Sequence, residues 1–252
     1  MSLLKLANRL ILANSDHWID PESRRRVAIP CGDEQMEAWV IESVESPELF
    51  CLKFPGTGGR AERAGPHPAE FLSPDRFETW TINPPGYGVD NGTACVSKMP
   101  TVCHAAWDAI SQKANGRPIV VTGNSLGCLY ALNVAANFPV AALTLRNPAP
   151  VHQLIRGRYS WWNLGLAGLV ARQVPSNMNA VSNGKKCSAA CLMITSDSDR
   201  VVPPKYQDMV ADAYNGPLIR FVLQDADHAT SVPEEQLADY KVALQQWQQL
   251  IS

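Results

Sequence analysis

The most informative segment of this sequence is Ile119-Val120-Val121-Thr122-Gly123-Asn124-Ser125-Leu126-Gly127. It contains the pattern G-x-S-x-G, which on its own occurs by chance in roughly one chain in ten of this length. The context of the pattern is more specific. A β-branched run leads into the serine, and residues 126–138, rich in Ala and Leu, predict a helix that ends before Pro139. The segment therefore predicts a strand, a sharp turn at Ser125 and a helix.

Such a turn suits a catalytic serine. A residue on a sharp strand-to-helix turn projects its hydroxyl clear of the sheet, in a strained backbone conformation. Glycines at positions 123 and 127 remove side chains that would collide with the neighbouring strand and helix. The start of the helix also directs backbone N–H groups toward developing negative charge. Ser125 is therefore a candidate nucleophile.

The rest of the chain alternates short apolar runs with segments that can be helical. This alternation predicts an α/β fold with a mostly parallel central sheet and helices on both faces. At the C-terminal end, apolar residues recur at three- and four-residue steps from Leu237 to Ile251, which predicts a packing helix. The predicted strands cover residues 26–30, 36–42, 49–54, 79–83, 118–122, 141–145, 189–195 and 217–223.

The turn at Ser125, its place in mid-chain and the order of elements resemble the α/β-hydrolase family over residues 26–251. The resemblance implies the chain order nucleophile, acid, histidine, with the last two on loops after the later strands. The spacing D-x-x-V-P that begins at Asp199 resembles the family's acid loop, with Asp197 as the alternative acid. His228 follows the last predicted strand, where the family's base belongs. The predicted triad is thus Ser125, Asp199 and His228.

The resemblance also implies an oxyanion hole. Residues 54–59, Phe-Pro-Gly-Thr-Gly-Gly, follow a strand and resemble the family's H-G-x-G loop, with Pro55 where histidine is frequent. Because the donors are backbone groups, this departure is compatible with a working hole. The N–H groups of Thr57 and Leu126 are the predicted donors.

One stretch interrupts the alternation of strands and helices. Residues 148–186 contain glycines among apolar residues and predict a partly helical cap or lid, inserted into a single domain of residues 1–252. Trp161 and Trp162 are candidates to line a pocket for an apolar acyl or alcohol group. The alternative is that this segment packs against its own core.

Composition excludes several classes of function. The net charge of −2 gives no broad basic surface, which argues against nucleic acid binding. The seven cysteines form no zinc-binding pattern, and their odd number favours free thiols in a reducing compartment. The N-terminal residues predict an amphipathic helix rather than a signal peptide, and no segment is long enough to span a membrane. We expect a cytoplasmic protein; the sequence leaves its oligomeric state open.

These features predict a serine hydrolase that cleaves a carboxylic ester or thioester of a small-molecule acyl substrate through an acyl-enzyme, with no metal or organic cofactor. Two alternatives stay open: an acyltransferase that uses the same triad, and a non-catalytic binding protein with the same fold. Dehalogenases and epoxide hydrolases would require aspartate at position 125.

Overall fold

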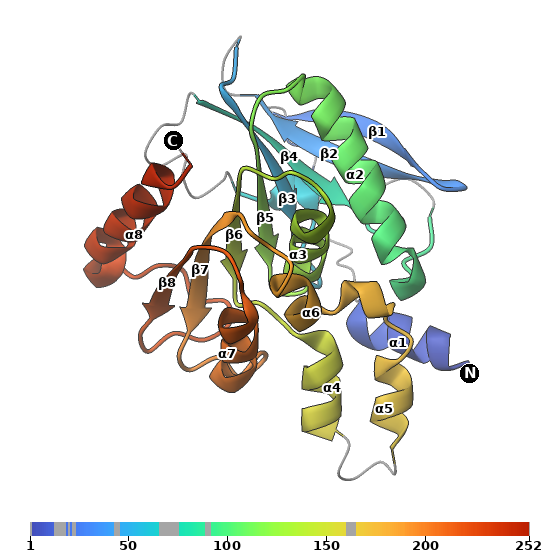
Figure 1. Cartoon of the computed structure of the whole chain (residues 1–252). Helices are drawn as coiled ribbons and strands as arrows, with labels where there is room; N and C mark the ends of the chain where they lie inside the picture. The colour runs from blue at the N-terminus through green and yellow to red at the C-terminus, as the bar shows by residue number, and fades with distance from the viewer. Residues whose placement is uncertain are drawn as a thin grey trace.

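The computed structural model describes residues 2–12, 19, 21, 24–42, 46–65, 76–88, 92–159 and 165–251. Its centre is an eight-stranded sheet of order β1-β2-β4-β3-β5-β6-β7-β8 (Figure 1). Strands β1, β2 and β4 pair antiparallel, whereas all pairs from β4–β3 to β7–β8 are parallel. The strands are β1 (Arg25–Cys31), β2 (Glu34–Ile41), β3 (Leu49–Phe54), β4 (Phe77–Asn83), β5 (Ile119–Asn124), β6 (Ala142–Arg146), β7 (Ala190–Ser196) and β8 (Leu218–Leu223).

The predicted sheet is confirmed, because every predicted strand is present with ends within two residues of the expected ones. Helices cover both faces, as predicted. Strand β5 illustrates how both faces of the sheet are buried. Its residues Ile119 and Val121 belong to one cluster of buried hydrophobic side chains, and Val120 belongs to a second cluster. Since successive side chains point to opposite faces, a central strand buried on both faces is apolar throughout.

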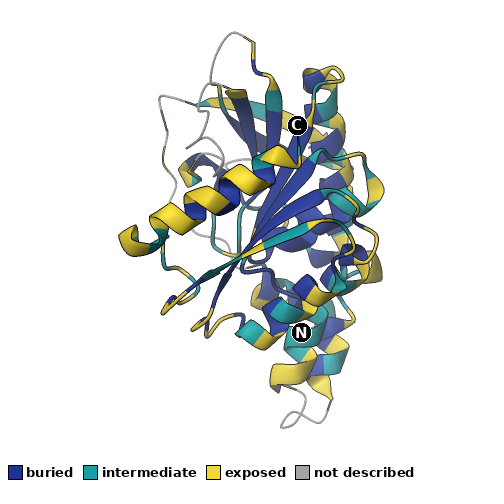
Figure 2. Ribbon diagram, turned by 60° about the vertical axis from the view of Figure 1, so that its left-hand side comes forward, coloured by how far each residue is buried: buried dark blue, intermediate teal, exposed yellow. Residues whose placement is uncertain are grey.

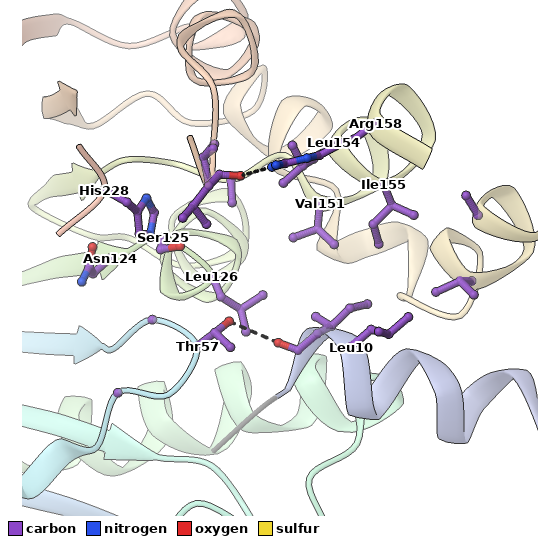
Figure 3. A pocket seen from close by; sticks show the side chains of 18 of the residues that line it. Leu10, Thr57, Asn124, Ser125, Leu126, Val151, Leu154, Ile155, Arg158 and His228 are labelled. Atoms are coloured by element: carbon purple, nitrogen blue, oxygen red, sulfur yellow. Dashed lines mark hydrogen bonds between the residues drawn. The ribbon is translucent and has the colours of Figure 1, made fainter. Parts of the chain in front are cut away.

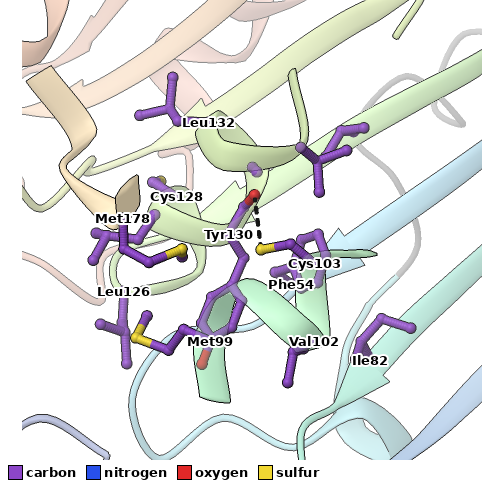
Figure 4. Close-up of a cluster of buried hydrophobic side chains, with 14 of the residues drawn as sticks. Phe54, Ile82, Met99, Val102, Cys103, Leu126, Cys128, Tyr130, Leu132 and Met178 are labelled. Atoms are coloured by element: carbon purple, nitrogen blue, oxygen red, sulfur yellow. Dashed lines mark hydrogen bonds between the residues drawn. The ribbon is translucent and has the colours of Figure 1, made fainter. Parts of the chain in front are cut away.

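The larger core lies under α2 (Met99–Ala114), α3 (Gly127–Asn137) and α7 (Pro204–Ala213), and the smaller under α8 (Leu237–Gln249). Figure 2 shows the sheet buried between exposed helix surfaces. In the larger core, Phe54 at the end of β3 stacks on Tyr130 of α3, with ring centroids 5.3 Å apart (Figure 4). This contact joins the loop after β3 to the helix after Ser125.

Between β6 and β7 the chain forms α4 (Val151–Tyr159), α5 (Leu166–Ala171) and α6 (Ala180–Gly184). Helices α4 and α5 pack against each other and project past the sheet, whereas α6 packs on α3 and α7 (Figure 1). The N-terminal helix α1 (Leu3–Ile11), predicted as amphipathic, packs against α5. None of the helices within the described residues has the length and apolar character needed to cross a membrane.

Candidate active site

Ser125 occupies the turn between β5 and α3, as predicted. Its φ angle of 53° is left-handed, a conformation that costs a non-glycine residue of order 1–3 kcal/mol. Its backbone N–H donates to the carbonyl oxygen of Arg146, 2.8 Å away at the end of β6. The residue is only 8% exposed, and it lines a cavity of about 900 Å³. A strained residue held in this way points its hydroxyl into the cavity from a fixed backbone position.

The glycines beside Ser125 are required by close backbone contacts. A Cβ atom at Gly127 would lie 2.1 Å from the carbonyl oxygen of Phe54, and one at Gly123 would lie 2.7 Å from the Cα atom of Cys128. Atoms cannot approach so closely, so both positions exclude any side chain. The G-x-S-x-G pattern is therefore a packing requirement of the turn.

The structure brings Asp199 and His228 into contact. His228 Nδ1 lies 2.7 Å from Asp199 Oδ2. The other carboxylate oxygen, Oδ1, accepts hydrogen bonds from the backbone N–H groups of Val201 and Val202, each 2.8 Å away. An ionised carboxylate can only accept hydrogen bonds. In the neutral imidazole, Nδ1 therefore carries the proton that it donates to Asp199, and Nε2 is left as an acceptor.

The alternative acid, Asp197, has a different place. Its carboxylate accepts hydrogen bonds from the backbone N–H groups of Asp225 and Ala226, at 3.1 and 3.2 Å. It therefore holds the start of the loop that carries His228, while Asp199 holds the imidazole itself. Of the two aspartates, the one favoured by the D-x-x-V-P spacing is the one in contact with the histidine.

Sequence reasoning missed three residues that support this pair. Buried Gln207 of α7 donates from Nε2 to Asp199 Oδ2 at 3.2 Å and to the carbonyl of Val202 at 2.7 Å. Asn147, just after β6, donates from Nδ2 to the carbonyl of His228 at 3.0 Å, and the Arg146 guanidinium donates to the carbonyl of Thr230. Asn147 could have been found, because a polar residue directly after a buried parallel strand lies at the carboxyl edge of the sheet. Nothing in the sequence marks Gln207.

Ser125 and His228 lie side by side at one end of the same cavity (Figure 3). Within the described residues, no hydrogen bond joins Ser125 Oγ to the imidazole. In enzymes without substrate, this bond is often long and shortens only in the complex. The arrangement therefore has the geometry of a nucleophile beside an oriented base.

The predicted oxyanion donors flank the serine. Thr57 and Leu126 both line the cavity, and within the described residues neither backbone N–H donates to a protein group. Gly56 brings the first loop close, because a Cβ there would lie 3.2 Å from Cβ of Ser125. The Thr57 hydroxyl donates to the carbonyl of Ile11 at 3.2 Å, which ties this loop to α1.

The cavity has a volume of about 900 Å³, within the range of small-molecule sites. Its catalytic end is polar, and most of the remaining wall is apolar side chains from α1, α4 and α5, with the charged Arg158 of α4 among them (Figure 3). The amphipathic helix predicted at the N-terminus thus contributes to the pocket, a role that its sequence does not indicate. The apolar wall includes Leu6, Leu10, Ile11, Val151, Leu154, Ile155, Leu166 and Val170.

Trp161 and Trp162, the residues predicted to line the pocket, lie outside the described residues. So do two of the four other histidines of the chain, His17 and His67. His104 packs edge-on against a phenylalanine of the core, with ring centroids 5.0 Å apart.

His152 of α4 places Nε2 3.1 Å from the carbonyl of Val174, and burial lowers the pKa of its imidazole. Neither His104 nor His152 lines the cavity that contains Ser125.

Comparisons with known proteins bear on the fold that carries this site. The sequence model of the α/β hydrolase fold matches residues 56–174. A search of curated proteins finds no match. Among solved structures, Est1E from Butyrivibrio proteoclasticus is similar with a TM-score of 0.69 and 17% identity, over 89% of this chain and 99% of that one.

An esterase of Pyrococcus furiosus is similar with a TM-score of 0.70 and 14% identity, over 94% and 98% of the two chains. A serine hydrolase homologue from Coxiella burnetii gives a TM-score of 0.59 and 16% identity, over 91% and 99%. At such identities the likeness concerns the fold. Together with the match of the sequence model, it shows that the chain has the α/β hydrolase fold.

Proposed function

We propose that the protein is a serine hydrolase that cleaves carboxylic esters or thioesters through an acyl-enzyme on Ser125. The observation that supports this most strongly is the 2.7 Å contact between His228 Nδ1 and Asp199 Oδ2 at the end of the cavity that Ser125 lines. A histidine oriented by a carboxylate beside a serine on a strained turn is the arrangement that activates a hydroxyl for acyl transfer.

In the first half of the reaction, Ser125 Oγ attacks the acyl carbonyl carbon while His228 Nε2 takes the hydroxyl proton. The imidazolium that forms is stabilised by Asp199, which remains ionised. The tetrahedral intermediate then collapses as the bond to the leaving group breaks, and His228 gives its proton to the departing alcohol or thiol. The products of this half are the acyl-enzyme and the free leaving group.

The second half removes the acyl group. His228 takes a proton from water, whose oxygen attacks the acyl carbonyl, and the proton then returns to Ser125 Oγ as the ester bond to the enzyme breaks. In both halves the N–H groups of Thr57 and Leu126 are the donors that we assign to the oxyanion. One such donor contributes about 10²–10³-fold to the rate.

The cavity argues for an apolar acyl or alcohol group in the substrate. Apolar side chains from three helices surround the space beyond Ser125, whose volume of about 900 Å³ exceeds what a short acyl group requires. Burying each methylene of a chain contributes about 0.8 kcal/mol. We therefore propose esters with medium-length apolar chains as substrates.

A fluorophosphonate probe tests the proposal, because it reacts only with an activated serine. We expect the unaltered protein to be labelled on Ser125, as mapped by peptide mass spectrometry, and to hydrolyse nitrophenyl esters. Ser125→Ala should lose both labelling and hydrolysis while retaining its thermal unfolding temperature. Labelling at another residue, or full hydrolysis by Ser125→Ala, would show that the assignment is wrong.

A further inference from the structure

Acidic and basic residues are distributed very unevenly along this chain. Residues 109–196 contain eight Lys and Arg residues but no Asp or Glu, and residues 1–15 contain two basic residues and no acidic one. The whole chain has 24 acidic and 22 basic residues, so all of the acidic ones lie elsewhere. These two segments supply α1, α4 and α5, the helices that form the wall of the pocket. The three helices therefore carry basic residues and no acidic ones, on a chain of net negative charge.

Two basic side chains beside this wall are available to a partner. Lys5 and Arg9 on α1 are exposed, whereas the exposed Arg156 of α4 and Arg172 at the end of α5 line a second, separate cavity. Within the described residues, neither Lys5 nor Arg9 forms an ion pair with a carboxylate. Their charge is thus not neutralised internally.

The mouth of the pocket is apolar and exposed. Leu10 is 63% exposed, Val201 54% and Leu166 42%, and all three line the pocket. Leu169 on α5 is exposed as well. Figure 2 shows exposed surface on the helices around the N-terminus, past the end of the sheet. Clustered exposed apolar side chains mark an interaction site, whereas scattered ones need no explanation.

Helix α1 places both kinds of side chain next to each other. Leu6 and Leu10 are one turn apart and line the pocket, and Lys5 and Arg9 are one turn apart on the adjacent stripe. A helix with leucines on one side and Lys or Arg beside them is typical of segments that lie in the interface of a bilayer, with the cations near anionic headgroups.

We propose that the face formed by α1, α4 and α5 around the pocket mouth docks on a bilayer surface that contains anionic lipids. The cations of this face contact the headgroups, and the leucines at the mouth enter the interfacial region. A bilayer fits this face better than an acidic protein, because the apolar side chains surround the opening of an apolar pocket that acyl chains can enter. Entry of an ester from the bilayer rests on the proposed function, whereas docking does not.

Vesicle sedimentation tests the docking with the Ser125→Ala protein, which cannot consume lipid. We expect binding to vesicles of phosphatidylglycerol and phosphatidylcholine, and much weaker binding to phosphatidylcholine alone or at high salt. Each basic residue near an anionic surface contributes roughly five-fold to binding, so Lys5→Gln with Arg9→Gln should weaken it about 25-fold. The matched control is Lys113→Gln with Lys241→Gln on α2 and α8, which should change binding by less than about two-fold.

Several results would overturn the docking: no vesicle binding at low salt, equal binding to neutral and anionic vesicles, or equal weakening by the control pair. The first of these would leave an acidic protein as the partner of this face. If the variant with Lys5→Gln and Arg9→Gln does not fold, the docking is still tested by comparing anionic with neutral vesicles and low with high salt. Hydrolysis of a water-soluble nitrophenyl ester by the unaltered protein is measured separately, so failure of the proposed function is distinguishable from failure of docking.

Discussion

The carboxyl edge of the sheet and the helical wall opposite it form one pocket, but their side chains are positioned by different forces. At the edge, Ser125, Asp199 and His228 are fixed by hydrogen bonds to backbone groups and to buried amides of Gln207 and Asn147. At the wall, α1, α4 and α5 contribute mainly apolar side chains, which are held by packing alone. Hydrogen bonds demand particular residues, whereas apolar packing accepts many. The edge should therefore be far less tolerant of substitution than the wall.

The largest contrast is expected between the two neighbouring aspartates at the edge. Asp199→Asn keeps the shape of the side chain but offers His228 Nδ1 an amide, which favours the wrong imidazole tautomer. We expect the kcat of ester hydrolysis to fall by about 10⁴-fold with little change in thermal stability. Asp197→Asn, which alters contacts to the amides of residues 225 and 226 but leaves the carboxylate beside His228 in place, is the control and should cost less than about ten-fold. Equal losses in the two variants would contradict the assignment of Asp199.

A second contrast compares glycines of the edge and the wall. Gly127→Ala forces a Cβ against the carbonyl oxygen of Phe54, so the turn must distort or unfold, and we expect a loss of about 3–5 kcal/mol in the free energy of unfolding. Gly168, inside α5, has no atom within 4 Å of an added Cβ. Gly168→Ala should therefore stabilise the protein by up to about 1 kcal/mol. Urea unfolding measures the free energy of unfolding of both variants. A loss of stability in Gly168→Ala as well as in Gly127→Ala would contradict the expected difference between edge and wall.

The third prediction separates the chemistry of the edge from binding at the wall by pH. Only the neutral imidazole of His228 can accept the proton of Ser125, because an imidazolium has no free lone pair. We expect kcat to fall as the pH is lowered from 8 to 5. Binding of a neutral apolar inhibitor in the pocket should stay nearly constant over the same range. A flat profile of kcat would count against His228 as the base.

The same difference explains how much could be predicted from the sequence. The succession of strands and helices and the turn at Ser125 follow from local patterns, because a strained turn requires particular residues at fixed spacing. Asp199 and His228 were predicted from the resemblance to the family, which implies an acid and a histidine on loops after the later strands. The predicted roles of Thr57 and Leu126 also come from that resemblance, because they depend on backbone N–H groups in the loops that follow two of the strands. Helix α1, by contrast, was predicted as amphipathic, but its place beside the pocket depends on tertiary packing over long sequence separations. Gln207 was missed for a similar reason, since a glutamine inside a helix carries no signal of its partner.

The smallest effect is expected at the wall. Ile155 of α4 lines the cavity beyond Val151 as seen from Ser125 (Figure 3), so Ile155→Trp should occupy space that only a longer acyl chain reaches. With a nitrophenyl ester series, we expect kcat/KM for long chains to fall about four-fold for each methylene displaced, and kcat/KM for the acetate to stay within about two-fold. Ile155→Val, which changes the volume little, should leave the chain-length profile unchanged. A parallel loss at all chain lengths would mean that the wall also sets the position of the triad, because only then would a distant side chain affect an ester too short to touch it.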